Sequence, residues 1–173
     1  MKSKERLQAT IAHKEPDQVC VDFGSTAVTG MHVRTVGLLR EHYGLETRPV
    51  KVCEPYQMLG EVEEDLLDRL GVDTEGLVGA SNIFGFRNEN WQPWTAPWGQ
   101  ELMVPADFQT KLDDNGDTLI FPQGDRDAPP SGRMPTGGYF FDTIVRQPPI
   151  DEDNLNPEDN LEEFTVLDDA AVA

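Results

Sequence analysis

The strongest secondary-structure pattern in the chain lies in residues 50–79, VKVCEPYQMLGEVEEDLLDRLGVDTEGLVG. It opens with a short apolar run, residues 50–53, of the kind found in buried strands. Apolar side chains then recur at helical spacing over residues 55–70, and acidic residues fill the first half of this predicted helix, where negative charge suits the helix dipole. A glycine ends the helix, and residues 75–79 provide another short strand. The stretch predicts a strand, a helix and a further strand.

The same alternation is found nearer the N-terminus. Ser3 is suited to cap a short helix over residues 3–13, and the apolar run of residues 19–23 follows it as a predicted strand. A further helix is predicted over residues 28–43, with Gly44 just beyond its end. Strands that alternate with helices are typical of parallel βα units.

The predicted fold class is therefore α/β, with part of a (β/α)8 TIM barrel. Residues 1–85 would supply its N-terminal βα units. Residues 86–150 are rich in Trp, Pro and Gly and contain an Asn-Gly pair between apolar runs, which is the strongest short-range hairpin signal. They are predicted to form a β-hairpin-rich excursion from the barrel. Residues 151–173 form an acidic C-terminal segment, with a helix start expected near residue 156.

Charge is unevenly distributed along the chain. There are 32 acidic and 14 basic side chains, giving a net charge of −18, and residues 1–52 hold 8 of the basic but only 6 of the acidic ones. Nucleic acid and anionic membranes are disfavoured as partners, because both need a cationic surface. No apolar run approaches the roughly 20 residues that span a bilayer, and the charged N-terminus lacks the apolar region of a signal peptide.

Local motifs give little sign of a metal or nucleophile. Cys20 and Cys53 lie in strand-like contexts and are predicted to be free thiols, which favours a reducing cytoplasm as the location. The histidines lack metal-ligand spacing to either cysteine, so no metal site is expected in this chain. The acidic run at residues 113–117 lacks the Gly and Glu of a calcium loop and is interpreted as a turn. Three tryptophans within residues 88–99 predict a small satellite core, with an aromatic wall for a flat ligand as the alternative.

Candidate site residues follow from the predicted barrel, because barrel enzymes place their active sites at the C-terminal ends of strands. Asp22, Ser25 and Thr26 lie at the end of one predicted strand, and Glu54 and Tyr56 follow the next. Their carboxylates and hydroxyls would orient a polar substrate, so these side chains are expected to bind substrate. Helix capping and hydrogen bonding within loops are the alternative roles. No catalytic residue is assigned.

Several segments resemble the uroporphyrinogen decarboxylase superfamily. Residues 3–23, SKERLQATIAHKEPDQVCVDF, resemble its opening, in which a short basic helix runs into K-E-P-D-x-V-P-V and the first barrel strand. Residues 70–73, LGVD, look like a later element of that family. Trp98-Gly99, followed by GYFFD at residues 138–142, is similar to a branch grouped with corrinoid-dependent methyltransferases. The resemblance covers most of residues 1–165.

The resemblance implies the N-terminal portion of a larger enzyme from the methyltransferase branch. The decarboxylases carry an arginine-rich loop, M-R-Q-A-G-R, that grips propionate groups, whereas residues 24–29 here contain no arginine. They also hold the pyrrole nitrogens with an Asp where this chain has Ala80. Porphyrinogen decarboxylation is therefore the weaker alternative, and a non-catalytic acidic binding module is a third.

The same resemblance implies partners and cofactors that this chain does not itself provide. In its full-length form the enzyme would use zinc, bound by ligands in its C-terminal half, and a corrinoid protein. A complete barrel needs eight βα units. The missing C-terminal barrel half is therefore an expected partner, and the chain alone is expected to be inactive.

Overall fold

The computed structural model describes residues 1–82 and 85–145. Within these ranges the helices are α1 (Ser3–Ile11), α2 (Val33–His42) and α3 (Glu64–Leu70), with a 3-10 turn at Pro122–Gly124. The strands are β1 (Met31–His32), β2 (Val50–Glu54), β3 (Leu59–Gly60), β4 (Gln92–Thr95), β5 (Glu101–Val104), β6 (Thr110–Leu112), β7 (Thr118–Ile120), β8 (Gly132–Met134) and β9 (Asp142–Thr143). The acidic segment at residues 151–173, with its expected helix start, lies outside the described residues.

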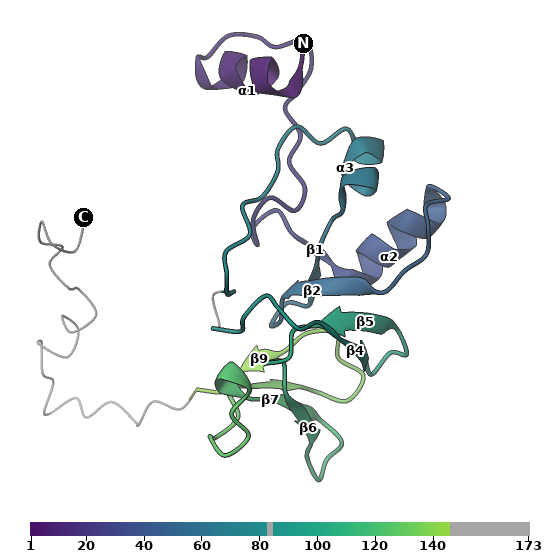
Figure 1. Cartoon of the computed structure of the whole chain (residues 1–173), viewed down its shortest axis with the longest axis vertical. Coiled ribbons are helices and arrows are strands. Elements are labelled where there is room, and N and C mark those ends of the chain that lie inside the picture. The colour runs from purple at the N-terminus through teal and green to yellow at the C-terminus, as the bar shows by residue number, and fades with distance from the viewer. Residues whose placement is uncertain (83–84, 146–173) are drawn as a thin grey trace, which may run out of the picture.

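The strands form two small sheets, and the partial TIM barrel predicted from the sequence is wrong. The strand orders are β1-β3-β2-β5-β4 and β6-β7-β8-β9, and the two sheets lie next to each other in Figure 1. The β2–β5 pair is parallel, and the other described pairings are antiparallel. No series of parallel strands alternating with helices is present in the described ranges.

The helix predicted over residues 55–70 accounts for much of this error, because only Glu64–Leu70 is helical. The backbone N–H groups of Tyr56 and Gln57 donate hydrogen bonds to the Glu54 carboxylate, at 3.1 and 2.6 Å. These bonds close a turn directly after β2. Leu59–Gly60 then folds back as β3, antiparallel to β2. The apolar spacing that indicated a helix here reflects burial of β3, which lies between β1 and β2 in the sheet.

The other predicted strands are extended segments outside any sheet. Residues 19–23 and 75–79 form no strand ladder, although their neighbourhoods meet where the Asp73 N–H donates to the Val21 carbonyl at 2.8 Å. The Val21 N–H in turn donates to the Asp73 carboxylate at 3.1 Å. Leu77 is fully exposed. The apolar character of these segments therefore does not correspond to burial in this structure.

The first two helices are predicted more accurately. The helix expected over residues 3–13 is confirmed as α1, but its N-cap is Lys2, and Ser3 is its first helical residue. The one expected over residues 28–43 is confirmed only from Val33 onward. It begins there because the His32 ring caps it, with Nδ1 accepting a hydrogen bond from the Arg34 N–H at 3.1 Å. Met31 and the cap residue His32 form the short strand β1 instead.

The predicted hairpin at residues 113–117 is confirmed between β6 and β7. One carboxylate oxygen of Asp113 accepts hydrogen bonds from the N–H groups of Asn115 and Asp117, both at 2.9 Å. Gly116 has a φ of +83°, a conformation that a side chain would strain. The strand leading into the turn is β6 rather than residues 102–104, which belong to β5 in the other sheet.

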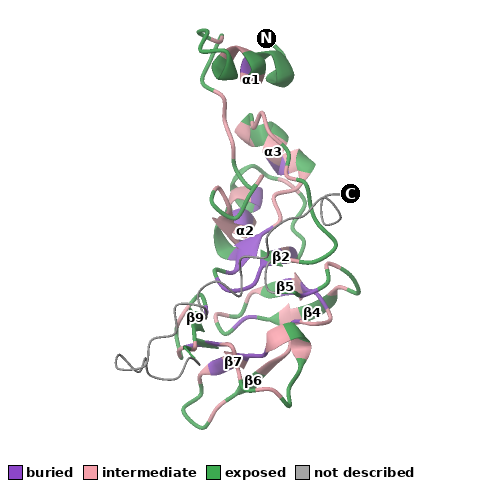
Figure 2. Cartoon of the chain, turned by 90° about the vertical axis from the view of Figure 1, so that its left-hand side faces the viewer, coloured by how far each residue is buried: buried purple, intermediate pink, exposed green. Residues whose placement is uncertain are grey.

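One buried apolar cluster connects α2, α3 and both sheets (Figure 2). Phe108 belongs to this cluster, and its ring centroid lies 5.1 Å from that of Trp94 and 6.1 Å from that of Phe141. Trp94 and Trp98 pack against this main cluster rather than forming a separate satellite core. Other members come from α2, α3 and both sheets: Val33, Val36, Leu66, Val52, Leu102, Val104, Ile120 and Met134.

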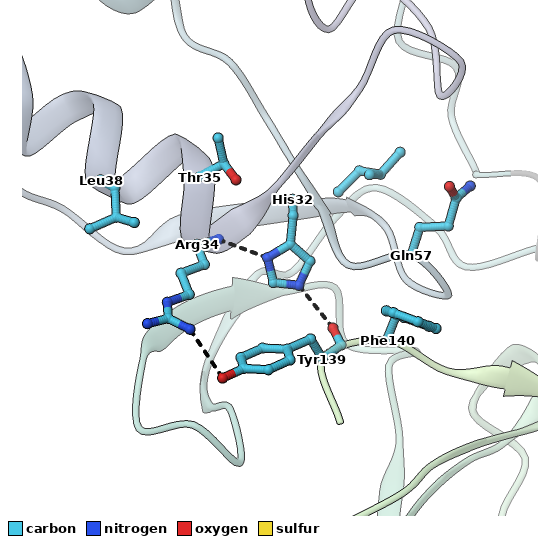
Figure 3. A pocket seen from close by; sticks show the side chains of 8 residues that line it. His32, Arg34, Thr35, Leu38, Gln57, Tyr139 and Phe140 are labelled. Atoms are coloured by element: carbon cyan, nitrogen blue, oxygen red, sulfur yellow. Dashed lines mark hydrogen bonds between the residues drawn. The ribbon is translucent and has the colours of Figure 1, made fainter. Parts of the chain in front are cut away.

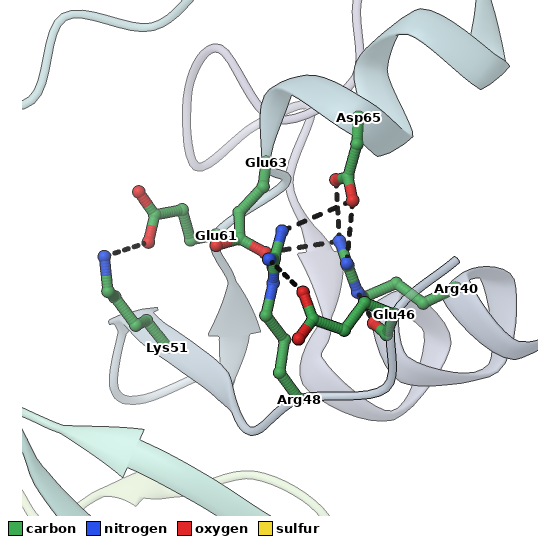
Figure 4. A network of polar contacts seen from close by, with 7 residues as sticks. All are labelled: Arg40, Glu46, Arg48, Lys51, Glu61, Glu63 and Asp65. Carbon is green, nitrogen blue, oxygen red and sulfur yellow. Dashed lines mark hydrogen bonds and ion pairs between the residues drawn. The ribbon is translucent and has the colours of Figure 1, made fainter.

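A network of ion pairs joins α2 and the chain before β2 to the start of α3 (Figure 4). The Arg40 guanidinium, only 2% exposed, donates to both carboxylate oxygens of Asp65 at 2.8 Å. Arg48 donates to Glu63 at 2.7 Å. The network neutralises acidic side chains that a chain of net charge −18 would otherwise leave to repel one another.

Acidification is expected to destabilise the fold below about pH 4. Hydrogen bonds from Arg40 hold the pKa of Asp65 below its ordinary value, and those from Ser25 lower the pKa of Asp22. A carboxyl whose pKa is lowered by folding stabilises the protein above its unfolded pKa. That contribution is lost as the pH falls through the folded value. Urea denaturation should therefore show a lower midpoint at about pH 3 than at about pH 7. Equal midpoints would contradict the prediction.

Within the described ranges, no helix combines the length and the apolar character needed to cross a membrane.

Candidate functional site

A cavity of about 350 Å³ lies where the segments around residues 23–30, 53–62 and 74–82 meet. Three of the five predicted site residues, Ser25, Thr26 and Glu54, line it. Ser25 and Thr26 come from one loop and Glu54 from the end of β2, so the structure does bring them together although its described residues form no barrel.

Asp22 supports the wall of this cavity. One carboxylate oxygen accepts a hydrogen bond from the Ser25 hydroxyl at 2.7 Å, and the other accepts one from the Thr74 hydroxyl at 2.7 Å. These bonds, led by the one from Ser25, hold the pKa of Asp22 below its ordinary value, so the carboxylate is ionised at neutral pH. Asp22 thus connects two loops far apart in sequence. This matches the alternative role of hydrogen bonding within loops, rather than substrate binding. Sequence patterns did not indicate Thr74.

Glu54 also has a structural role. It is 5% exposed, and both of its oxygens accept the backbone N–H groups of the turn after β2. Burial raises the pKa of this carboxyl above its ordinary value, and the two N–H donors act in the opposite direction. Glu54 therefore lies in the cavity wall with its carboxyl group held in a fixed orientation by the turn.

Replacing Glu54 with glutamine is expected to destabilise the protein by about 1–3 kcal/mol. The amide NH2 group would face one of the two backbone N–H groups, which would leave two donors opposed and one hydrogen bond lost. Urea denaturation followed by circular dichroism measures the change. Glu41→Gln, at an exposed position on α2, is the control and should alter stability by less than about 0.5 kcal/mol. A similar effect of both substitutions would contradict this role for Glu54.

Tyr56 and Thr26 differ in location. Tyr56 does not line the cavity; its ring is 8% exposed and lies 6.4 Å from that of Phe141, within the core. Its inclusion as a substrate-binding residue is not supported by this placement. Thr26 lies at the cavity, and its hydroxyl is 3.4 Å from that of Thr29.

The cavity has a strongly one-sided charge. Glu54, Glu61 and Glu75 line it, and its described lining contains no Lys, Arg or His. Glu61 is paired with Lys51 at 2.9 Å, so part of its charge is compensated from outside the cavity. The remaining polar lining consists of neutral hydroxyl and amide groups. The arrangement favours a cationic or uncharged ligand over an anion.

The thiol of Cys53 is not an activated nucleophile. Desolvation by the surrounding chain raises its pKa to about 11, although the residue as a whole is exposed, and the nearby Glu54 carboxyl adds to the effect. The thiol donates to the Leu59 carbonyl at 3.3 Å. The thiol is therefore protonated at neutral pH, whereas a metal ligand or a nucleophile must be a thiolate.

The residues of this part of the chain do not fit a zinc site. In residues 1–82 and 85–145, no three His, Cys, Asp or Glu side chains are grouped so that they could hold a metal ion. Both cysteines are free.

Comparison with known proteins finds no matching family model, no matching curated protein and no matching solved structure.

Proposed function

We propose that this chain forms the substrate-binding part of a methyltransferase related to the uroporphyrinogen decarboxylase superfamily, and that it binds a small cationic or uncharged methylated compound. The observation that carries the proposal is the cavity of about 350 Å³, whose described lining contains three glutamates and no basic side chain. The resemblance of residues 3–23 and 138–142 supports the choice of family.

The charge of the cavity argues against the alternative substrate, a porphyrinogen. That molecule carries several carboxylates, which would lie close to Glu54, Glu61 and Glu75 without a cation to pair with. Residues 24–29, where the decarboxylases carry an arginine-rich loop, contain no basic side chain, and residues 24–27 form part of the cavity wall here. Carboxylates that lie close together repel one another, particularly where solvent is partly excluded.

In this proposal the residues of this chain bind and orient the substrate. Carboxylates attract its positive charge, and the hydroxyls of Ser25 and Thr26 are placed to hydrogen-bond its polar atoms. Zinc and a corrinoid protein would supply the methyl-transfer chemistry with other parts of the full-length enzyme. The free cysteines favour a cytoplasmic location for this activity.

Isothermal titration calorimetry with tetramethylammonium and with citrate tests the proposal. The cation is expected to bind and citrate is not. Glu75→Gln, at an exposed position on the cavity wall, should weaken cation binding, whereas Glu41→Gln on α2 should leave it unchanged. Citrate binding as tight as that of the cation, or a cation affinity that does not respond to Glu75→Gln, would overturn the proposal.

A further inference from the structure

A second pocket, of about 560 Å³, has the opposite charge character (Figure 3). It is formed by the start of α2, the turn after β2 and the loop before β9. Its described lining includes Arg34 and His32 but no Asp or Glu, in a chain with 32 acidic side chains. A cationic pocket in so acidic a molecule would attract an anion while the surrounding surface repels it.

Arg34 is the main source of this positive charge. Its guanidinium donates to the Tyr139 hydroxyl at 3.1 Å and lies 5.5 Å from the centre of the Tyr139 ring. No carboxylate lies within ion-pair distance of Arg34 in the part of the chain that the structure describes. The arginines at positions 6, 40, 48 and 87, in contrast, all pair with carboxylates. A guanidinium has five N–H donors, so Arg34 keeps donors for a ligand.

The pocket is held in shape by contacts between segments far apart in sequence. Because Nδ1 of His32 accepts the Arg34 N–H, its Nε2 carries the proton and donates to the Tyr139 carbonyl at 2.8 Å. The Trp98 ring lies 5.4 Å from the His32 ring and 5.4 Å from the Tyr139 ring. Tyr139 and Arg34 are thus fixed before any ligand arrives, which reduces the entropy cost of binding.

Large apolar side chains form the rest of the lining. Leu38 and Phe140 are each 56% exposed, and Tyr139 is 41% exposed. All three line the pocket, where Figure 3 shows Tyr139 and Phe140 below the first turn of α2. Apolar and aromatic surface next to a single cation suits a ligand with a flat apolar body and one negative charge.

We propose that this pocket binds a small aromatic monocarboxylate. Its carboxylate would pair with the Arg34 guanidinium, and its ring would pack against Tyr139 and Phe140. Gln57 and Thr35 lie in the pocket wall, where they can hydrogen-bond further polar substituents. A ligand with several negative charges would find no second arginine or lysine in the described lining. The pocket adjoins the glutamate-lined cavity, since Leu59 lines both, but it has a different charge and goes beyond the function proposed for that cavity.

Isothermal titration calorimetry with benzoate on the full chain tests this proposal. Benzylamine, with the same ring and the opposite charge, and acetate, with the charge but no ring, are the matched ligands. Benzoate is expected to bind more tightly than either. Arg34→Met should weaken benzoate binding by at least about tenfold, because it removes the charged partner. Arg126→Met, at another exposed arginine outside the pocket, should leave the affinity unchanged.

A further variant separates the charge from its positioning. Tyr139→Phe keeps the aromatic wall but removes the hydroxyl that accepts from Arg34. It should reduce benzoate affinity less than Arg34→Met does, while circular dichroism shows that both variants are folded. Benzoate binding that is absent, that is matched by benzylamine, or that is unchanged in Arg34→Met would overturn the proposal.

Discussion

Replacing Phe108 with alanine is expected to lower the free energy of unfolding by about 3–5 kcal/mol, the largest effect predicted for this chain. The Phe108 side chain is 2% exposed. Its ring centroid lies 5.1 Å from that of Trp94, 6.1 Å from that of Phe141 and 6.4 Å from that of Phe86. These rings come from separate segments, so the cavity left by truncation cannot be filled by a small shift of one neighbour.

Urea denaturation followed by tryptophan fluorescence measures this effect, because Trp94 packs directly against Phe108. Phe140→Ala is the matched control. Its side chain is 56% exposed, and its truncation should change stability by less than about 1 kcal/mol. Equal effects of the two substitutions would mean that Phe108 does not occupy the centre of the core.

Arg40→Met should have the next largest effect, a loss of about 3 kcal/mol, at the low end of the cost of breaking a buried ion pair. The substitution keeps much of the side-chain volume but removes the paired hydrogen bonds to Asp65 and the bond from Nε to the Glu46 carbonyl at 3.0 Å. The cost is placed at the low end because the Asp65 side chain is 37% exposed and water partly replaces the lost partner.

Arg48→Met provides the comparison for this prediction. Arg48 contacts some of the same acidic groups, but its side chain is 38% exposed, so its loss should cost only about 0–1 kcal/mol. Chemical denaturation at low and high salt would separate the two cases. Added salt should reduce the effect of the exposed arginine more than that of the buried one. If Arg40→Met and Arg48→Met were equally stable, the buried Arg40–Asp65 pair would not be the main stabilising contact of the network.

The sequence was most informative where local geometry determines structure. The turn at residues 113–117 depends on Asp113 and Gly116, whose preferences act within a few residues, and it was predicted correctly. The barrel was predicted incorrectly because apolar spacing does not reveal what the apolar side chains pack against. Leu59 fits a helical stripe, yet it lies in a strand, because the Glu54 carboxylate turns the chain just before it.

The candidate site shows the same limit. Ser25, Thr26 and Glu54 were identified by their positions after apolar runs, and they do line one cavity. Their partners could not be identified in this way. The Asp22–Thr74 bond spans 52 residues, and the contact of His32 with the Tyr139 carbonyl spans 107. Only the folded chain shows that a glutamate-lined cavity and an arginine-containing pocket exist in the same molecule.

The most direct measurement is a two-ligand titration of the 15N-labelled protein, followed by the backbone amide signals in NMR spectra. Tetramethylammonium should shift the signals of Ser25, Thr26 and Gly76 at the glutamate-lined cavity and leave those of Thr35 and Tyr139 in place. Benzoate should shift Thr35 and Tyr139 and leave the first group unchanged. If both ligands shifted the same residues, or if the cation shifted none of those at the cavity, the charge of the cavity would not select its ligand.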